Sequence, residues 1–400
     1  MLTIPDYRLR LPGPTAVPEP IRQATALPVL NHRGAEFRAM LAECHQRLKP
    51  IFGTAHDVLT FAGSGTAMME AALANILSPG DAVLVVVAGQ FGERFVAIAK
   101  AFGAEVHALD VEWGGALDAD RVAARLRQRA YRAVVMVHNE SSTGVAYDVA
   151  AVGAVVRDTP ALLIVDSVSG LAGVEMKMDA WGADIVVSAS QKSLMCPPGL
   201  GLAAISAKAW QAIGRDGRMP CFFADFRRAR ASLDKDGTSF TPPVTLVYGL
   251  LVALRMIDAE GLANVLARHD RLASALRAGV QALGLALYNQ PSTSSATVTA
   301  MKVPAGLDGG AIVRHMRERY RTVIAGARHP SQTGKVIRIG TMGMIGEADI
   351  ITDLRHLEAT LNDLGRPAEV PHAGVRAALD VLAARAQAPR TNKAADGEPS

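Results

Sequence analysis

The sequence predicts an α/β protein with a mostly parallel sheet and flanking helices, followed by a smaller C-terminal α+β domain. Between Val58 and Ile205, short apolar runs alternate with helical patterns. The runs are continuously apolar, which is typical of strands buried on both faces of a parallel sheet. After Trp210 the pattern changes to long helices with few strands, which indicates a second folding unit.

The first half of the chain supplies the sheet. The expected strands are 58–62, 82–87, 106–109, 133–137, 162–165, 185–188 and 202–205. The expected helices between them are 66–77, 91–102, 120–129 and 149–157. Ahead of the sheet, the proline-rich segment from Leu11 to Pro28 is expected to run extended over a surface and not as a helix.

The second half begins with a loop-like stretch at residues 215–243. Helices are expected at 244–260, 262–282, 311–320, 348–364 and 373–386, and strands at 297–303 and 336–339. Residues 391–400 have few apolar side chains and are expected to be disordered. The predicted domains are an N-terminal arm (1–20), a large domain (21–255), a small C-terminal domain (256–368) and a tail (369–400).

The composition excludes several function classes. The chain has 400 residues, 50% of them hydrophobic, and a formal net charge of +4, with basic residues scattered along the sequence. Such a charge gives no indication of nucleic-acid or membrane binding. Cys44, Cys196 and Cys221 form no CxxC pair, so neither a disulfide framework nor a metal site is expected. Because the N-terminus lacks the pattern of a secretory signal, we expect a cytoplasmic protein.

A glycine-rich turn, Ala62-Gly-Ser-Gly-Thr66, connects a predicted strand to a predicted helix. Glycine allows close backbone approach, and the start of the helix offers free N–H groups and the positive end of its dipole. The turn therefore suits a phosphate group. It matches neither the P-loop nor the dinucleotide-binding pattern, and an ordinary strand-to-helix turn would also explain it.

Two further predicted strands end in ionisable residues. Asp166 follows an apolar strand, at the edge where α/β proteins bind ligands, and could pair with a protonated ring nitrogen. Its alternative role is to cap a helix. Lys192 follows another apolar strand, where an apolar, positively charged pocket would favour a neutral, nucleophilic amine. Its alternative role is that of a solvated surface lysine.

The order of these three features resembles fold type I enzymes that use pyridoxal 5′-phosphate (PLP). The local sequences are similar to class V aminotransferases, and more narrowly to the alanine–glyoxylate and serine–glyoxylate aminotransferase family. The resemblance extends from Pro12 to about Leu364. It rests on eight segments that occur in the same order, namely 61–66, 89–94, 138–144, 165–169, 190–192, 197–199, 240–244 and 334–340.

This resemblance implies roles at the cofactor. Lys192 would hold PLP as a Schiff base and act as the proton shuttle, and Asp166 would keep the pyridine nitrogen protonated. Phe91 would stack on the ring and Ser141 would hydrogen-bond near its 3-hydroxyl group. The phosphate would be held by Ser64, Gly65, Thr66 and Gln191, and by Thr241 from the partner subunit of a homodimer with shared active sites.

The resemblance also implies a reaction. Arg338 would bind the substrate carboxylate through two parallel hydrogen bonds. The predicted activity is transamination from a small amino acid, serine or alanine, to glyoxylate or a similar 2-oxo acid. His32 and Arg33 would either contact the substrate or have a surface or dimer-contact role. Relatives often carry histidine at Thr66, tryptophan at Phe91 and tyrosine at Phe240.

Other activities within the same fold remain open. One alternative is a pyridoxamine–pyruvate aminotransferase, although the Gly-Ser-Gly-Thr turn speaks for a phosphorylated cofactor. Aspartate or ureidoglycine could also be the donor. A PLP lyase such as a cysteine desulfurase would need a mobile nucleophilic cysteine, whereas Cys196 precedes two prolines. A non-enzymatic relative is disfavoured because Lys192, Asp166 and Arg338 occur together.

Overall fold

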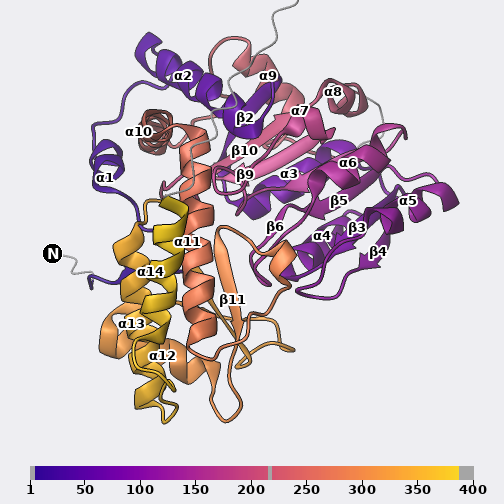
Figure 1. Ribbon diagram of the computed structural model, residues 1–400. Coiled ribbons are helices and arrows are strands. Elements are labelled where there is room, and N and C mark those ends of the chain that lie inside the picture. Colours follow the sequence, from indigo (N-terminus) through magenta and orange to yellow (C-terminus); the bar gives the residue numbers. More distant parts are fainter. Residues whose placement is uncertain (1–4, 215–218, 387–400) are drawn as a thin grey trace, which may run out of the picture.

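A seven-stranded sheet forms the centre of the computed structural model, which describes residues 5–214 and 219–386. Figure 1 shows β2 at one end of the sheet and β4 at the other. The strands follow the spatial order β2 (Asp57–Gly63), β10 (Gly199–Ile205), β9 (Ile185–Ala189), β8 (Leu162–Asp166), β5 (Ala133–Val137), β3 (Ala82–Val87) and β4 (Glu105–Asp110).

The sheet is mostly parallel, as predicted, with one reversed strand. β10 pairs antiparallel with both β2 and β9, whereas the remaining pairs are parallel. The other six strands therefore run in one direction, and their carboxyl ends meet at one edge of the sheet. That edge is where open α/β sheets bind their ligands.

Helices cover both faces of the sheet. Successive strand residues point to opposite faces, so Leu163 and Val165 join one apolar cluster while Leu162 and Ile164 join another. The first cluster includes residues of α2 (Ala35–Phe52), α6 (Val149–Arg157) and α10 (Val244–Glu260). The second includes residues of α3 (Gly65–Ile76), α4 (Gln90–Ala101) and α8 (Ala207–Ile213). Burial on both faces explains why the strands are continuously apolar.

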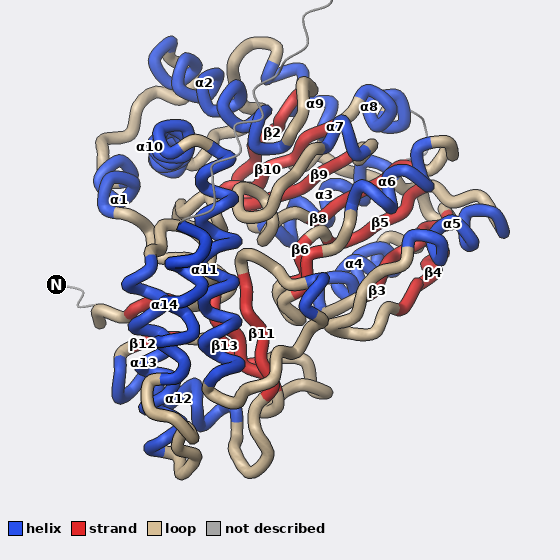
Figure 2. The backbone as a smooth tube through the Cα atoms, viewed as in Figure 1, coloured by secondary structure: helices blue, strands red, loops and turns tan. Residues whose placement is uncertain are grey.

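A smaller α+β unit follows α10 and has its own apolar cluster. Figure 2 shows α11, α13 and α14 beside one another, with β11 next to them. Val375, Ala378 and Leu382 of α14 belong to this cluster. Its elements are α11 (Leu262–Ala282), α12 (Gly309–Tyr320), α13 (Glu347–Asp363), α14 (Ala373–Ala386) and the antiparallel sheet β11 (Val298–Lys302), β14 (Val336–Gly340) and β13 (Ala325–Gly326).

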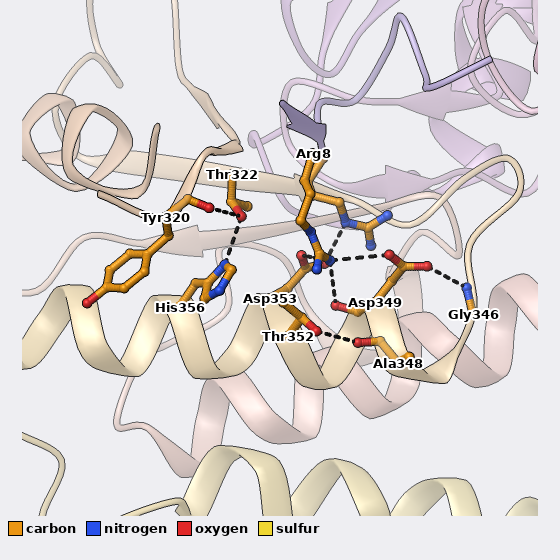
Figure 3. A network of polar contacts seen from close by, with 10 residues as sticks. Arg8, Tyr320, Thr322, Gly346, Ala348, Asp349, Thr352, Asp353 and His356 are labelled. Atoms are coloured by element: carbon orange, nitrogen blue, oxygen red, sulfur yellow. Dashed lines mark hydrogen bonds and ion pairs between the residues drawn. The ribbon is translucent and has the colours of Figure 1, made fainter. Parts of the chain in front are cut away.

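The N-terminal segment is attached to this smaller unit. Its strand β1 (Arg8–Leu9) pairs in parallel with β12 (Thr322–Val323). Figure 3 shows Arg8 above α13, where its guanidinium contacts Asp349 and Asp353, each at 3.2 Å. The fully buried Asp353 carboxylate also accepts a 2.5 Å bond from Nε of the buried Arg10. This ionic cluster fixes the path of the chain just before Pro12.

Two local predictions were wrong. The proline-rich segment contains helix α1 (Glu19–Thr25), because Pro18 and Pro20 occupy its N-cap and first turn, where no helical N–H is required. The stretch predicted as a loop contains helix α9 (Phe226–Leu233), which Asp225 caps by accepting from the backbone N–H of Arg227 at 2.9 Å.

The remaining elements are short or lie at the edge of the sheet. They are α5 (Ala119–Gln128), β6 (Asn139–Glu140), β7 (Val145–Ala146), α7 (Met178–Trp181) and the 3-10 turn Pro291–Thr293. Residues 391–400, predicted to be disordered, lie outside the described residues. Among the described helices, none is long and apolar enough to cross a membrane.

Candidate active site

A cavity of about 190 Å³ lies at the carboxyl-end edge of the large sheet. All predicted cofactor-binding residues except Thr241 line it. The lining comprises Ser64, Gly65, Thr66, Met69, Phe91, Arg94, Asn139, Ser141, Asp166, Val168, Ser169, Gln191 and Lys192. These residues are far apart in the sequence and meet because the strands that precede them end side by side.

One wall of the cavity is the start of α3. Ser64 is the N-cap residue, and its hydroxyl accepts from the backbone N–H of Ala67 at 3.3 Å. A Cβ atom on Gly65 would lie 2.7 Å from the side chain of Val168, so only glycine fits this turn. Nη1 of Arg94 donates to Oγ1 of Thr66 at 3.0 Å. A helix N-terminus beside a guanidinium group suits an anion such as a phosphate.

Asp166 lies at the end of β8 and is 3% exposed. Its carboxylate accepts a 2.7 Å hydrogen bond from the backbone N–H of Val168. Burial raises the pKa of Asp166 to about 6, although this hydrogen bond and the charges of Lys192 and Arg94 oppose the rise. A buried carboxylate of this kind is stabilised by a protonated partner, such as a pyridinium nitrogen.

Lys192 lies just beyond β9 and lines the same cavity as Ser64. Burial lowers the pKa of its amine to about 8, an effect that Asp166 opposes and the charge of Arg338 reinforces. Nζ donates a hydrogen bond to the carbonyl oxygen of Pro12. The amine can therefore lose its proton near neutral pH, as a nucleophile or a proton shuttle must.

A second cavity, of about 390 Å³, adjoins the first and shares with it Phe91, Arg94, Ser141 and Lys192. Arg338 of β14 lines it and is 8% exposed. Its Nη1 donates to the carbonyl oxygen of Ser141 at 2.8 Å, and its Nη2 donates to that of Gly326 at 2.7 Å. These bonds fix the guanidinium group, and each Nη atom keeps a second N–H for a ligand.

Phe91 forms a wall common to both cavities and is held in place from behind. The carboxylate of Glu140 accepts from the backbone N–H of Phe91 at 3.0 Å and from the N–H of Ser142 at 3.1 Å. Burial raises the pKa of Glu140 to about 7. The guanidinium carbon of Arg94 lies 4.6 Å from the centre of the Phe91 ring. The ring therefore has a fixed orientation towards the cavity.

Arg94, Asn139 and Glu140 have no role predicted from the sequence. Arg94 follows Phe91 by three residues in one helix, and this spacing could have placed it on the same face. Asn139 donates to Oγ of Ser169 at 2.8 Å and to Oγ1 of Thr297 at 2.9 Å. These partners are distant in sequence, so no local pattern indicates them.

Several predicted residues lie outside these cavities. Thr241 is exposed and lines a separate hollow with Phe240, so within one chain it does not contact the cavity at Lys192. His32 and Arg33 are not among the lining residues of either cavity. In the part of the chain that the structure describes, no group of three or more His, Cys, Asp or Glu side chains could hold a metal ion.

Cys196 lacks the properties that a desulfurase nucleophile needs. Its side chain is fully buried, and its thiol donates to the carbonyl oxygen of Leu194 at 3.2 Å. Burial raises the pKa of this thiol far above its ordinary value, so it remains protonated. The lyase alternative therefore finds no support at this position.

The chain is similar to known proteins in both sequence and fold. The profile of the family described as aminotransferase class-V matches residues 22–344. The chain is 38% identical to L-aspartate–glyoxylate aminotransferase of Paracoccus denitrificans, covering 92% of this chain and 94% of that protein. It is 39% identical to serine–glyoxylate aminotransferase of Hyphomicrobium methylovorum, covering 89% and 90%. The crystal structure of pyridoxamine-pyruvate aminotransferase from Mesorhizobium loti is similar with a TM-score of 0.90 and 29% identity, covering 95% and 98%.

Proposed function

Because the chain belongs to the class-V aminotransferase family, we propose that it binds PLP at Lys192 and transfers the amino group of a small amino acid to glyoxylate. One observation carries the proposal. The start of α3, the buried carboxylate of Asp166 and the amine of Lys192 line a single cavity. Phosphate, ring nitrogen and aldehyde each find a partner of suitable chemistry there.

The residues present fit this cofactor. Gly65 lets the start of α3 pack closely against Val168 in the cavity wall, and Thr66 and Arg94 add polar groups that could contact a phosphate. Asp166 would hold the ring nitrogen protonated, and Phe91 would cover one face of the ring. When bound, PLP withdraws electrons from the substrate and makes the proton on its α-carbon more acidic.

The protein's own groups would then do the remaining work. Lys192, as a neutral amine, would take the proton from the α-carbon of the substrate and deliver it to the cofactor. This is general acid–base catalysis. Arg338 would hold the substrate carboxylate and so orient the α-carbon towards Lys192. Serine and alanine are the donors expected from the sequence, and the two named relatives use aspartate or serine with glyoxylate.

We also propose a homodimer in which Thr241 of a second copy completes the phosphate site. In a single chain Thr241 is exposed and outside the cavity, so the proposed contact would come from another copy. Exposed apolar side chains, namely Leu27, Val29, Phe222 and Phe223, offer surface that a second copy would cover. Light scattering after size-exclusion chromatography would give twice the monomer mass of 42.1 kDa.

The pyridoxamine–pyruvate reaction is the second candidate, supported by the structural similarity to such an enzyme. One experiment separates the two. Protein saturated with PLP and passed through a desalting column is supplied with an amino donor and glyoxylate, and glycine is measured. Our proposal predicts that the cofactor stays bound and glycine forms. Loss of the cofactor, with alanine formed only from pyridoxamine and pyruvate, would establish the rival reaction.

A further inference from the structure

The two adjoining cavities carry more positive charge than the proposed reaction uses. Their lining includes four basic side chains, Arg94, Lys192, Arg328 and Arg338, and one acidic side chain, Asp166. The second cavity, where the substrate would bind, has no acidic residue in its lining. Such a site favours anionic ligands and disfavours cationic ones.

Three of the four cations have a partner or a task. Arg94 bonds Thr66 at the phosphate cradle, and Lys192 bonds the carbonyl of Pro12 and faces Asp166. Arg338 is held by two backbone carbonyls and is matched to one substrate carboxylate. The phosphate and ring of the cofactor and the carboxylate of a monocarboxylic substrate therefore have charged partners without the fourth cation.

Arg328 is the cation that remains. It follows β13, and that strand pairs with β14 so that Ala325 lies opposite Arg338. Within residues 5–214 and 219–386, no hydrogen bond or ion pair of its side chain is formed. Burial is the main cause that lowers the pKa of Arg338 to about 10, the charge of Glu140 opposes this shift, and the charge of Arg328 contributes to it. Two cations near one cavity repel each other, and an anion between them relieves the repulsion.

We propose that Arg328 is a specificity residue that binds the second carboxylate of a dicarboxylic amino donor of the aspartate type. The inference rests on the proposed aminotransfer and deepens it by naming the donor class. Arg338 would take the α-carboxylate, and Arg328 would take the side-chain carboxylate across the same cavity. Glyoxylate has a single carboxylate and would need only Arg338.

The position of Arg328 determines how strongly it would discriminate between amino donors. Its side chain is exposed at the mouth of the cavity, so water screens the interaction. We therefore expect discrimination of roughly tenfold to a hundredfold, and not the larger factors of a fully buried carboxylate site. Serine and alanine would still react, because they leave no buried polar group unpaired.

The test compares Arg328→Gln with the unaltered, PLP-saturated protein, using glyoxylate as acceptor. The expected loss in kcat/KM is about tenfold to a hundredfold for aspartate and less than about threefold for serine and alanine, mainly through KM. Arg328→Lys keeps the charge and should recover most of the aspartate activity. Arg127→Gln, which removes an exposed arginine of α5 that lines neither cavity, should leave all donors unchanged.

A binding measurement separates this inference from the proposed function. The binding of two ligands without an amino group is measured separately by calorimetric titration of the protein. Succinate has two carboxylates and propionate has one carboxylate. Arg328→Gln should weaken succinate binding about tenfold and leave propionate unchanged. If both ligands, or all donors, respond equally to the substitution, Arg328 does not bind a second carboxylate. If no donor yields glycine, the proposed aminotransfer fails, and the succinate titration still decides the role of Arg328.

Discussion

The amine of Lys192 donates a hydrogen bond to the backbone carbonyl of Pro12, which ties the candidate catalytic residue to the N-terminal segment. Two residues earlier, Arg10 is bound by the buried carboxylate of Asp353 in α13. Thr15, three residues after Pro12, donates its hydroxyl to the carbonyl of Lys192 at 3.1 Å. The segment thus runs from the ionic cluster on α13 directly to the candidate active site.

The close contact at Gly13 should make this residue irreplaceable. Its φ is +102°, and a Cβ atom there would lie 2.4 Å from Cδ of Lys192. We expect Gly13→Ala to displace Lys192 and to reduce both PLP retention and aminotransfer at least tenfold. The matched control is Gly306→Ala, where φ is +84° and nothing lies within 4 Å. If both variants retain the cofactor equally well, the contact with Lys192 is unimportant.

Asp353 should contribute strongly to stability. It is fully buried and neutralises Arg10 and Arg8, so Asp353→Asn would leave buried charge unpaired. We expect the free energy of unfolding to fall by about 3–5 kcal/mol. Glu347→Gln removes an exposed partner of Arg271 from the same helix and should cost less than about 1 kcal/mol. Chemical denaturation of both variants measures the two losses, and equal losses would contradict the argument.

The rate of PLP capture should depend on pH through Lys192. Only the neutral amine reacts with an aldehyde, and the pKa of Lys192 is lowered to about 8. Below that value each pH unit reduces the neutral fraction about tenfold. The rate should therefore rise from pH 6 to 8 and level off above. Stopped-flow absorbance of cofactor-free protein mixed with PLP measures it, and a rise that continues towards pH 10 would show an unshifted lysine.

Removing a neighbouring positive charge should shift this profile. Arg94 contributes to the lowered pKa of Lys192, so Arg94→Gln should raise the pKa and move the midpoint of capture to higher pH. Arg127→Gln serves again as the distant control, and its midpoint should equal that of the unaltered protein. A midpoint that stays in place in Arg94→Gln would show that the charge of Arg94 does not tune the amine.

Much of the fold follows from local pattern. Strands such as 162–166 are continuously apolar because both faces of the sheet are covered, and this pattern is visible in the sequence. The reversed direction of β10 has no such signal, since an apolar run reads the same in either direction. The helix at 19–25 is not evident from the sequence, because proline usually breaks a helix, whereas Pro18 and Pro20 lie at the start of this one.

The candidate site was predictable where a residue ends a strand. Asp166 and Lys192 each follow an apolar run, so their meeting at one edge follows from the parallel order. Glu140 is placed by its bond to the backbone of Phe91, and Arg328 by the pairing of β13 with β14. No spacing in the sequence indicates either. Thr241 stays a prediction, because its proposed contact requires a second copy of the chain.

The central claim, that PLP is attached to Lys192, is tested most directly by trapping the attachment. Protein saturated with PLP is reduced with borohydride, digested, and mapped by mass spectrometry. We predict a pyridoxyl-phosphate group on the peptide that contains Lys192, and no trapped group at that position in Lys192→Ala. A group found on a different lysine, or none on the unaltered protein, would contradict the account.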